Sequence, residues 1–535
     1  MSVIPSLLRR KVKWLTAFVA VIIIICLIAA ITIAYFLRDD SKSVSVQNKV
    51  ATEVSLPNYY SIGMILQRDK PIVISGTATP KSSLVVQLTE ESSGGRVNSN
   101  QSDSVSVMSG SDGKFKASLP ERSGSSKNYT LTISSGNVVL LKIKKILIGD
   151  VFIAAGQSNM ELNFKGYYED DEVAAENMGS IIQRDELPNT ISDRLVHFLI
   201  LDHKSKTRVD GDAPLLQICE NKWLSAKGDD ILNLGYLSQF FAEQLRNQDP
   251  DIPVGIIQTA WDGTSITRHM QGGDIFTNHI APFRGFNVAG ILWYQGESDA
   301  FDDASAFAYQ YRFATLINQY RKVFADDELP FLFVQLARYD NTPVDWAIVR
   351  QAQLAVALDK VDDNVAMVVS IDTDKGTSKV IHPLGKDILA QRMAQQWEAI
   401  RNDSDIPNGP LAISAVSDDN DSQVVVSFLK GTSEGLQVRQ PNYFREVGYN
   451  QVSDASFAGL QGFEVAGSDG VFHQAAAVIE GDKVRVFSKE VKDIKQVRYL
   501  WSGPANPNGG VLLYNKLQLP ASPFTLPVIE KTGIE

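Results

Sequence analysis

The sequence predicts a mixed α/β protein, with one three-layer α/β domain flanked by two β-rich domains and preceded by a transmembrane helix. Three observations carry this prediction. Between residues 149 and 405, continuous apolar runs alternate with helical patterns, as in a parallel sheet covered on both faces. In residues 56–148 and 406–535, short alternating runs are separated by turn residues, which is typical of β-domains. Residues 14–37 are apolar and uncharged.

The apolar segment Trp14–Leu37 is long enough to cross a bilayer. As a helix it would reach ~36 Å, against ~30 Å of hydrocarbon. Basic residues lie in the tail before it, so the positive-inside rule predicts a cytosolic tail (1–13) and a body on the extracellular, lumenal or periplasmic side. A cleaved signal peptide is the alternative, but its apolar region would be shorter and a small-residue cleavage site would follow. Residues 38–55 are polar and are predicted to form a stalk.

Composition narrows the functional classes. The net charge of −11 over 535 residues, without a basic patch, argues against a nucleic-acid partner. Of the two cysteines, Cys26 lies in the apolar segment, so Cys219 is the one cysteine in the rest of the chain. A single cysteine excludes a disulfide framework and a cysteine zinc site there. The HExxH, P-loop and GxGxxG motifs are absent. We therefore expect neither a metal nor an organic cofactor.

The first β-rich region, residues 56–148, is predicted to be a β-sandwich from the runs IVISGTA, LVVQLT, KFKASLP and NYTLTIS. Its tract Glu90–Asp112 is rich in Ser, Gly and Asn and is predicted to be a mobile loop. The second region, 406–535, contains the alternating runs VVVSFL, AAAVIE, KVRVFS and QVRYLWS. Its prolines in LPASPFTLP predict an extended tail along a surface.

The middle domain contains apolar runs that predict buried strands and amphipathic runs that predict helices. The predicted strands are VFIAA (151–155), VGIIQTA (254–260), VAGILWYQ (288–295), FLFVQLA (331–337) and VAMVVSI (365–371). The predicted helices cover 234–247, 306–324, 345–358 and 382–397.

Ser158 follows the first of these strands, in the turn Gly156-Gln157-Ser158-Asn159. Ligands bind at the carboxyl edge of open α/β sheets, and a buried strand that ends in a glycine-led turn places the next side chain there. A serine at that edge can act as a nucleophile where a base and oxyanion donors are within reach. The alternative is a turn that caps the next helix.

The later strands end in further candidate groups. Gly263, in WDGT, can offer a backbone N–H to an oxyanion. Gln295 can donate an amide N–H, and Glu297 can orient neighbours or bind a hydroxyl. His382 is the best base among six histidines, because it follows the last strand and precedes a proline that can open a helix. For each of these, an ordinary structural turn or a structural histidine is the alternative.

Four segments in this order, GDVFIAAGQSNME, WDGT, ILWYQGESDA and IHPLGK, resemble the sialate O-acetylesterases, a branch of the SGNH hydrolases. Similar segments continue through both β-domains, from about Asn58 to Leu526. The resemblance implies a flavodoxin-like domain and a cofactor-free esterase that removes O-acetyl groups from sugars, notably sialic acid. It implies the following roles: Ser158 as nucleophile, His382 as base, the N–H groups of Ser158 and Gly263 with Gln295 as oxyanion hole, and Gln157, Asn159 and Glu297 as substrate-binding residues. Ser298 or Asp299 could supply the polar donor in place of Gln295.

The sequence departs from the family pattern in two places. Asp262 stands where the family often has glycine, which adds a negative charge near the developing oxyanion. The aspartate commonly found two or three residues before the histidine is absent, since Val380 and Lys379 occupy those positions. We expect Asp372 or Asp374 to orient the imidazole instead, with a Ser-His dyad as the alternative.

These departures leave two other functions open. One is an acetylesterase for other glycans, such as acetylated xylan, because specificity depends on the loops around the pocket. The other is a catalytically weak, membrane-tethered glycan-binding protein. Sequons at Asn100, Asn128, Asn402 and Asn420 predict a glycoprotein if the chain passes through a eukaryotic secretory route.

Overall fold

The computed structural model describes most of the chain after residue 48. The described residues are 49–91, 97–168, 189–201, 203, 223–339, 345–360, 363–373, 381–418, 422–441, 452–454, 456, 459–501 and 512–530. The predicted tail, the transmembrane segment 14–37 and most of the stalk lie outside them, so the membrane anchor stays a prediction. The helices that the structure does describe include none long and apolar enough to span a membrane.

A parallel sheet forms the centre of the middle domain, in the order β10-β12-β9-β13-β14-β15, with β11 antiparallel at the β10 edge. The strands are β9 (Val138–Gly156), β10 (Asp193–Ile200), β11 (Leu224–Ala226), β12 (Val254–Gln258), β13 (Gly290–Tyr294), β14 (Phe331–Val334) and β15 (Val365–Val368). The predicted strands are all present, and β10 is a strand that the sequence analysis missed. Because β9 comes first in the domain but lies between β12 and β13, the strand order reverses beside it.

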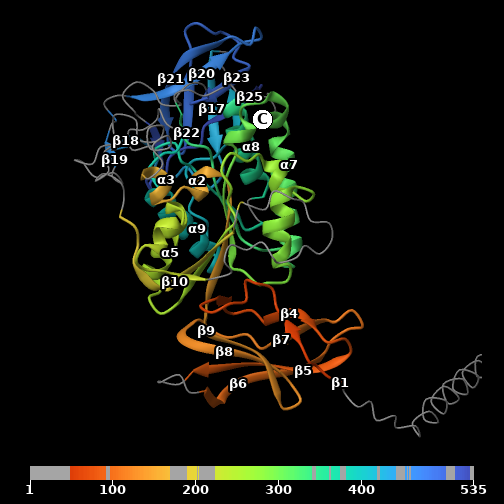
Figure 1. The fold of residues 1–535 in the computed structure, drawn as a ribbon. Helices are drawn as coiled ribbons and strands as arrows, with labels where there is room; N and C mark the ends of the chain where they lie inside the picture. Colours follow the sequence, from red (N-terminus) through yellow and green to blue (C-terminus); the bar gives the residue numbers. More distant parts are fainter. Residues whose placement is uncertain are drawn as a thin grey trace, which may run out of the picture. The chain divides into compact units, whose positions relative to one another are not determined.

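Helices cover both faces of this sheet, as predicted (Figure 1). On one face, Phe152 of β9 packs against Phe241 and Trp397, with ring centroids 4.9 and 5.3 Å apart. On the other face, Trp293 of β13 stacks on Phe313 at 5.9 Å. The helices of the first face are α5 (Tyr236–Gln248) and α9 (Lys386–Arg401), and those of the second are α7 (Asp303–Phe324) and α8 (Asp345–Asp359).

Two helix boundaries differ from the prediction because of local contacts. Helix α7 begins at Asp303 rather than residue 306, because the Asp302 side chain accepts a hydrogen bond from the Ser305 N–H at 2.9 Å. Helix α9 begins at Lys386, four residues after His382. The segment between them is a turn in which the Gly385 N–H donates to the Thr373 carbonyl at 2.7 Å.

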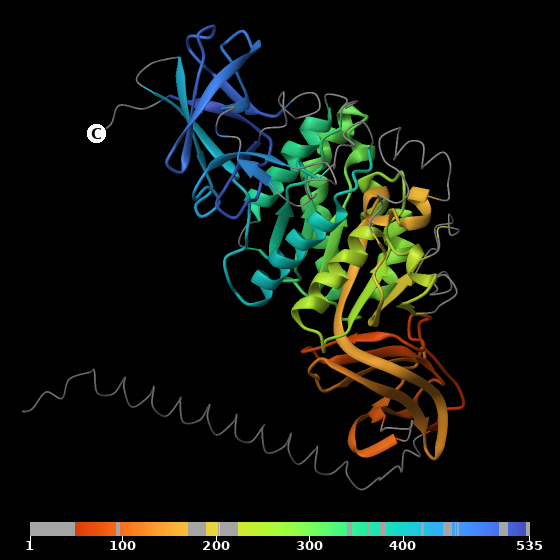
Figure 2. The same ribbon diagram turned by 90° about the vertical axis from the view of Figure 1, so that its left-hand side faces the viewer.

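The N-terminal β-domain shares strand β9 with the central sheet, so the predicted boundary at residue 148 falls inside a continuous strand (Figure 2). The first half of β9 extends the sheet β6-β5-β8-β9, which also contains β3, parallel to β9, and β1. A second sheet has the order β2-β4-β7. The bounds are β1 (Lys49–Val50), β2 (Val54–Ser55), β3 (Ile65–Gln67), β4 (Ile72–Ala78), β5 (Ser82–Glu91), β6 (Val97–Met108), β7 (Lys114–Leu119) and β8 (Ser125–Ser135).

Strand β6 corrects the prediction of a mobile loop over Glu90–Asp112. It pairs with β5 in antiparallel register from Ser83↔Met108 to Glu91↔Val97. The polar composition of the tract concealed the alternation of Ser and Val at residues 104–107. A sheet strand with one solvated face needs only that alternation, so a serine-rich segment can complete the sheet.

The C-terminal β-domain is a closed barrel with the order β16-β17-β22-β21-β20-β23-β25, beside a three-stranded sheet β19-β18-β24. Phe463, Tyr499 and Phe524 pack together in its core. The predicted extended tail is wrong in part, because strand β25 closes the barrel against β16 and β23. The bounds are β16 (Ala412–Ser417), β17 (Gln423–Phe428), β18 (Gln437–Pro441), β19 (Val452–Asp454), β20 (Leu460–Ala466), β21 (Phe472–Glu480), β22 (Lys483–Phe487), β23 (Gln496–Tyr499), β24 (Leu512–Tyr514) and β25 (Phe524–Ile529).

Candidate active site

Ser158 lies at the carboxyl edge of the sheet, at the first position of the short helix α2 (Ser158–Glu161). The preceding Gly156 has φ +128° and lies so close to β13 that an added Cβ would be 2.1 Å from the Tyr294 carbonyl oxygen. The Gln157 N–H donates to that same carbonyl at 3.0 Å. Only glycine fits this close approach, which turns the chain and presents Ser158 at the strand-order reversal.

A cavity of about 400 Å³ opens beside Ser158. It brings together residues from the loops after β9, β12 and β13 and from the segment before α9. The described lining residues are Gln157, Ser158, Glu161, Leu162, Asn163, Gly166, Asp262, Gly263, Glu297, Ser298, Phe301, Ile381 and His382. The predicted nucleophile, base and oxyanion glycine thus line one cavity, although Ser158 and His382 are 224 residues apart in the sequence.

His382 is buried against this cavity with 9% of its surface exposed. Burial, and to a lesser degree the charge of Lys386, lowers the pKa of His382 to about 3. The imidazole is therefore neutral at neutral pH, which is the form that can accept a proton. Its backbone is held by the Tyr167 hydroxyl, which donates to the carbonyls of His382 and Pro383 at 3.2 and 3.3 Å.

The two predicted orienting acids have different positions. Both carboxylate oxygens of Asp372 accept hydrogen bonds from Arg392 at 2.7 Å, and Oδ2 also accepts one from the Tyr514 hydroxyl at 2.9 Å. Asp372 thus links α9 to β24 of the C-terminal domain. Asp374 lies outside the described residues, and its role as orienting acid stays a prediction.

Gln295 differs from its predicted role as an oxyanion donor. Its side chain is fully buried, and its Nε2 lies within hydrogen-bond distance of Gln157 Oε1 (3.2 Å), the Thr264 carbonyl (3.0 Å) and Asp299 Oδ2 (2.7 Å). Its Oε1 accepts a hydrogen bond from the Tyr309 hydroxyl at 3.0 Å. The amide holds the loops after β9 and β12 in place, so the candidate oxyanion donors that remain are the backbone N–H groups of Ser158 and Gly263.

Asn159 is also an internal connector rather than a residue of the cavity lining. Its Nδ2 donates to Glu297 Oε1 at 2.5 Å and to the Ile381 carbonyl at 3.1 Å. Its Oδ1 accepts a hydrogen bond from Lys386 Nζ at 2.6 Å. Asn159, next to Ser158, is thus hydrogen-bonded to Ile381, which precedes His382. This bond fixes the serine segment and the histidine segment relative to each other.

Lys386 is a residue of the site that the sequence analysis missed. It is fully buried, donates to the Pro383 carbonyl at 2.7 Å and lies 5.3 Å from the centre of the Tyr294 ring. Burial lowers the pKa of Lys386 to about 7, although the nearby Glu297 carboxylate opposes this shift. Its signal in the sequence was a lysine four residues after His382, in a stretch predicted to be helix.

Asp262, which stands in WDGT where the family often has glycine, takes part in a hydrogen bond of this turn through its backbone N–H. The Asp262 N–H donates to Glu161 Oε2 at 2.7 Å, while Glu161 Oε1 lies 3.1 Å from His203 Nε2. Burial raises the pKa of Glu161 to about 8. Glu161 therefore engages the Asp262 N–H, and Gly263, the next residue of the turn, lines the cavity and stays the candidate oxyanion donor of this turn. Glu161 is a second cavity residue that sequence reasoning missed.

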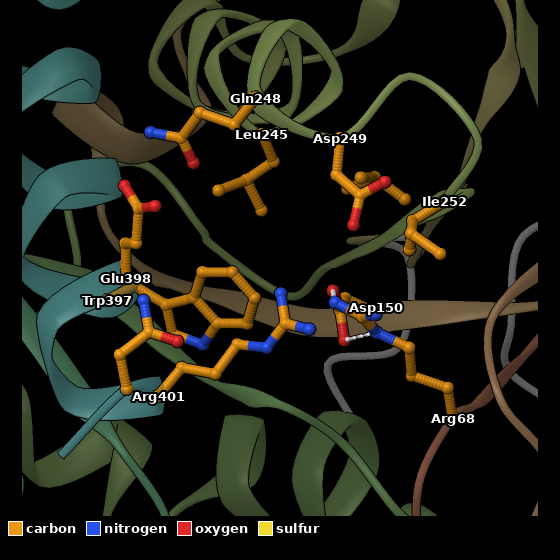
Figure 3. A pocket seen from close by; sticks show the side chains of 11 residues that line it. Arg68, Asp150, Leu245, Gln248, Asp249, Ile252, Trp397, Glu398 and Arg401 are labelled. Carbon is orange, nitrogen blue, oxygen red and sulfur yellow. Dashed lines mark hydrogen bonds and ion pairs between the residues drawn. The ribbon is translucent and has the colours of Figure 1, made fainter.

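A second cavity, of about 170 Å³, lies at the opposite edge of the sheet, where β12 begins and α5 and α9 end (Figure 3). Arg68 and Asp150 form a buried ion pair there, with Arg68 Nε and Nη2 at 2.9 and 2.7 Å from the two carboxylate oxygens. Arg401 lies over the Trp397 ring, 5.4 Å from its centre. Across the described parts of the chain, no group of three or more His, Cys, Asp or Glu side chains could hold a metal ion.

Comparison with known proteins shows what the middle domain is similar to. Residues 148–398 match the family model described as carbohydrate esterase, sialic acid-specific acetylesterase. A curated sialate O-acetylesterase from Pongo abelii is 23% identical over 301 residues, which are 47% of this chain and about half (53%) of that protein. The crystal structure of a carbohydrate acetylesterase from Xanthomonas citri superposes with a TM-score of 0.68 at 27% identity, covering 88% of this chain and 99% of that one. The resemblance inferred from the sequence motifs is confirmed.

Proposed function

We propose that this chain, whose residues 148–398 form a domain of the sialic acid-specific acetylesterase family, removes O-acetyl groups from sugars through an acetyl-serine intermediate. One observation carries the proposal: Ser158, Gly263 and His382 come from three separate segments and line the same cavity. A structural turn or a capping serine would not require a buried neutral histidine and a turn glycine at the same cavity.

The proposed reaction is a two-step acyl transfer. His382 accepts the proton of the Ser158 hydroxyl as its oxygen attacks the acetyl carbonyl carbon. The carbonyl oxygen becomes an oxyanion, which the N–H groups of Ser158 and Gly263 stabilise. The C–O bond to the sugar breaks, the sugar oxygen takes the proton from His382, and acetyl-serine remains. Water then loses a proton to His382 as its oxygen attacks the acetyl carbon. The bond from that carbon to Ser158 Oγ breaks, Oγ takes the proton from His382, and acetate leaves.

The direct test is acetate release from p-nitrophenyl acetate and from acetylated sugars by the full chain. Ser158→Ala should abolish turnover, whereas Ser265→Ala, in the loop after β12, should retain it. Turnover in Ser158→Ala would contradict the serine mechanism. A folded wild-type chain that binds glycans but releases no acetate would instead support the glycan-binding alternative, in which Asp262 opposes the oxyanion.

The location of the enzyme is a further proposal. A membrane anchor at residues 14–37 would hold the catalytic body on the extracytoplasmic side, where glycan substrates are accessible. Protease added to intact cells should then remove the body. Full protection of the body would contradict this topology, and a mature chain that begins after Leu37 would show cleavage of the segment instead.

A further inference from the structure

We propose that Thr264 and His269 are positioning residues for catalysis, because their hydrogen bonds fix the turn that offers the Gly263 N–H to the oxyanion. This inference rests on the proposed esterase function and extends it to two residues outside the cavity lining. Neither side chain would touch the substrate. Each acts through the direction in which the Gly263 N–H points.

The tip of the turn Trp261–Thr264 is exposed. Gly263 has φ +62°, and a Cβ added there would meet no heavy atom within 4 Å. A backbone N–H stabilises an oxyanion best when it already points at it, since reorienting a donor during the reaction cancels part of the gain. The direction of the Gly263 N–H therefore depends on the bonds that hold the rest of the turn. One is the bond from the Asp262 N–H to Glu161, and the others lie at the Thr264 end.

Thr264 closes the turn with its side chain. It is fully buried, and its hydroxyl donates to the Trp261 carbonyl at 2.6 Å, which joins the last residue of the turn to the first. The Thr264 carbonyl accepts a hydrogen bond from Gln295 Nε2 at 3.0 Å. Two residues on, the Ile266 N–H donates to Asp299 Oδ2 at 2.8 Å. The end of the turn is thus tied to the loop after β13, and the hydroxyl transmits that fixed position to the start of the turn.

His269 supplies the next hydrogen bond of the chain. Its ring is fully buried, and its Nε2 lies 2.8 Å from the Thr264 hydroxyl oxygen. The hydroxyl has a single proton, which it donates to the Trp261 carbonyl, so His269 Nε2 carries the proton of this second contact. Burial lowers the pKa of His269 to about 3, so the ring is neutral at neutral pH. The buried Nδ1 has no hydrogen-bond partner among the described residues, which leaves the contact with Thr264 to orient the ring.

Replacement of Thr264 tests the proposal. Thr264→Val keeps the shape of the side chain but removes the hydroxyl, so kcat for p-nitrophenyl acetate per titrated active site should fall by ~10-fold or more, with little change in KM. Thr264→Ser restores the hydroxyl and should recover most of the lost kcat. Thr267→Val removes an exposed hydroxyl from the same segment and should change neither quantity. An unchanged kcat in Thr264→Val would overturn the inference.

A transition-state analogue separates positioning from folding. Methylboronic acid becomes tetrahedral when Ser158 Oγ adds to its boron, and one of its oxygens then takes the place of the oxyanion. The inhibition constant of methylboronic acid should rise in Thr264→Val by the same factor by which kcat/KM falls. Partial unfolding alone would lower the titrated amount of enzyme but leave this constant at its wild-type value. An unchanged constant would therefore contradict the positioning role.

Variants of His269 test the chain of hydrogen bonds. His269→Gln places an amide N–H close to the position of Nε2 and should keep kcat near wild type, whereas His269→Leu leaves the Thr264 hydroxyl without its donor and should lower kcat several-fold. Combined with Thr264→Val, His269→Leu should cost little more than Thr264→Val alone, because both act through the same hydroxyl. Fully additive losses would contradict the chain. Failure of the wild-type chain to hydrolyse any ester would instead contradict the proposed function.

Discussion

The two cavities at opposite edges of the central sheet differ in how their carboxylates are partnered. At the edge where β12 begins, Asp150 accepts two hydrogen bonds from Arg68 (Figure 3). It accepts a third from Gln67 at 3.2 Å. At the edge where Ser158 lies, Glu297 Oε2 has no hydrogen-bond partner among the described residues. Arg68 follows β3 of the N-terminal β-domain, and Asp150 lies on the strand that both domains share. The Arg68–Asp150 ion pair joins the two domains, whereas Glu297 Oε2 could still accept a hydrogen bond from a ligand.

The first test of this difference compares the kcat of variants at the two edges, with a reacting group removed at one edge and a cation removed at the other. His382→Ala should lower kcat for a small acetyl ester by at least ~10³, as Ser158→Ala should, because proton transfer and attack act as a unit. Arg401→Ala, in the smaller cavity, should keep kcat within about twofold of wild type. Steady-state kinetics on p-nitrophenyl acetate measures all three. A comparable loss in Arg401→Ala would mean that the two edges are functionally coupled.

The stability of the opposite edge provides the second test. Arg68→Ala leaves the buried Asp150 carboxylate without its charged partner, so the free energy of unfolding should fall by ~3–5 kcal/mol. The kcat of the fraction that remains folded should stay near the wild-type value. Urea denaturation followed by fluorescence measures the first quantity, and active-site titration normalises the second. Replacing both partners by apolar residues, Arg68→Met with Asp150→Leu, should cost less than Arg68→Ala alone.

The third prediction separates Asp372 from Asp374. Asp374→Asn should lower kcat by ~10² with little change in KM, since an imidazole without its orienting acid adopts the wrong tautomer more often. Asp372→Asn should leave kcat near wild type but lower the thermal unfolding temperature, because it weakens the bonds to Arg392 and Tyr514. The reverse pattern would assign the orienting role to Asp372. Full activity in both variants would favour the Ser-His dyad.

The smallest expected effect concerns Lys386. Lys386→Met should lower kcat by ~10-fold, because the Lys386 ammonium bonds both Asn159 and Pro383 and so fixes the nucleophile segment against the histidine segment. The Lys386 charge also lowers the pKa of His382, so its removal raises that pKa and moves the acid limb of kcat/KM to higher pH. Lys322→Met, at an exposed position of α7, should change neither quantity. A lower kcat with an unmoved acid limb would limit Lys386 to a structural role.

Much of the architecture followed from local patterns in the sequence. Continuous apolar runs such as 151–155 and 331–337 became buried parallel strands, because a strand covered on both faces must be apolar throughout. Each run ended at polar residues, and since parallel strands end at one edge, Ser158, Gly263 and His382 met there. The transmembrane prediction also rested on sequence alone and concerns residues outside those that the structure describes.

The tertiary structure alone decided which polar groups are free and which are engaged. Gln295 could have donated to an oxyanion, but the packing of Thr264, Asp299 and Tyr309 around it occupies its amide. Lys386 became a buried connector because its helix begins directly behind the histidine turn. The partners in these contacts lie up to 227 residues apart in the sequence. Whether a polar side chain already has hydrogen-bond partners depends on such long-range neighbours. Local composition and spacing therefore determine where polar groups gather, but not which of them remain available for a substrate.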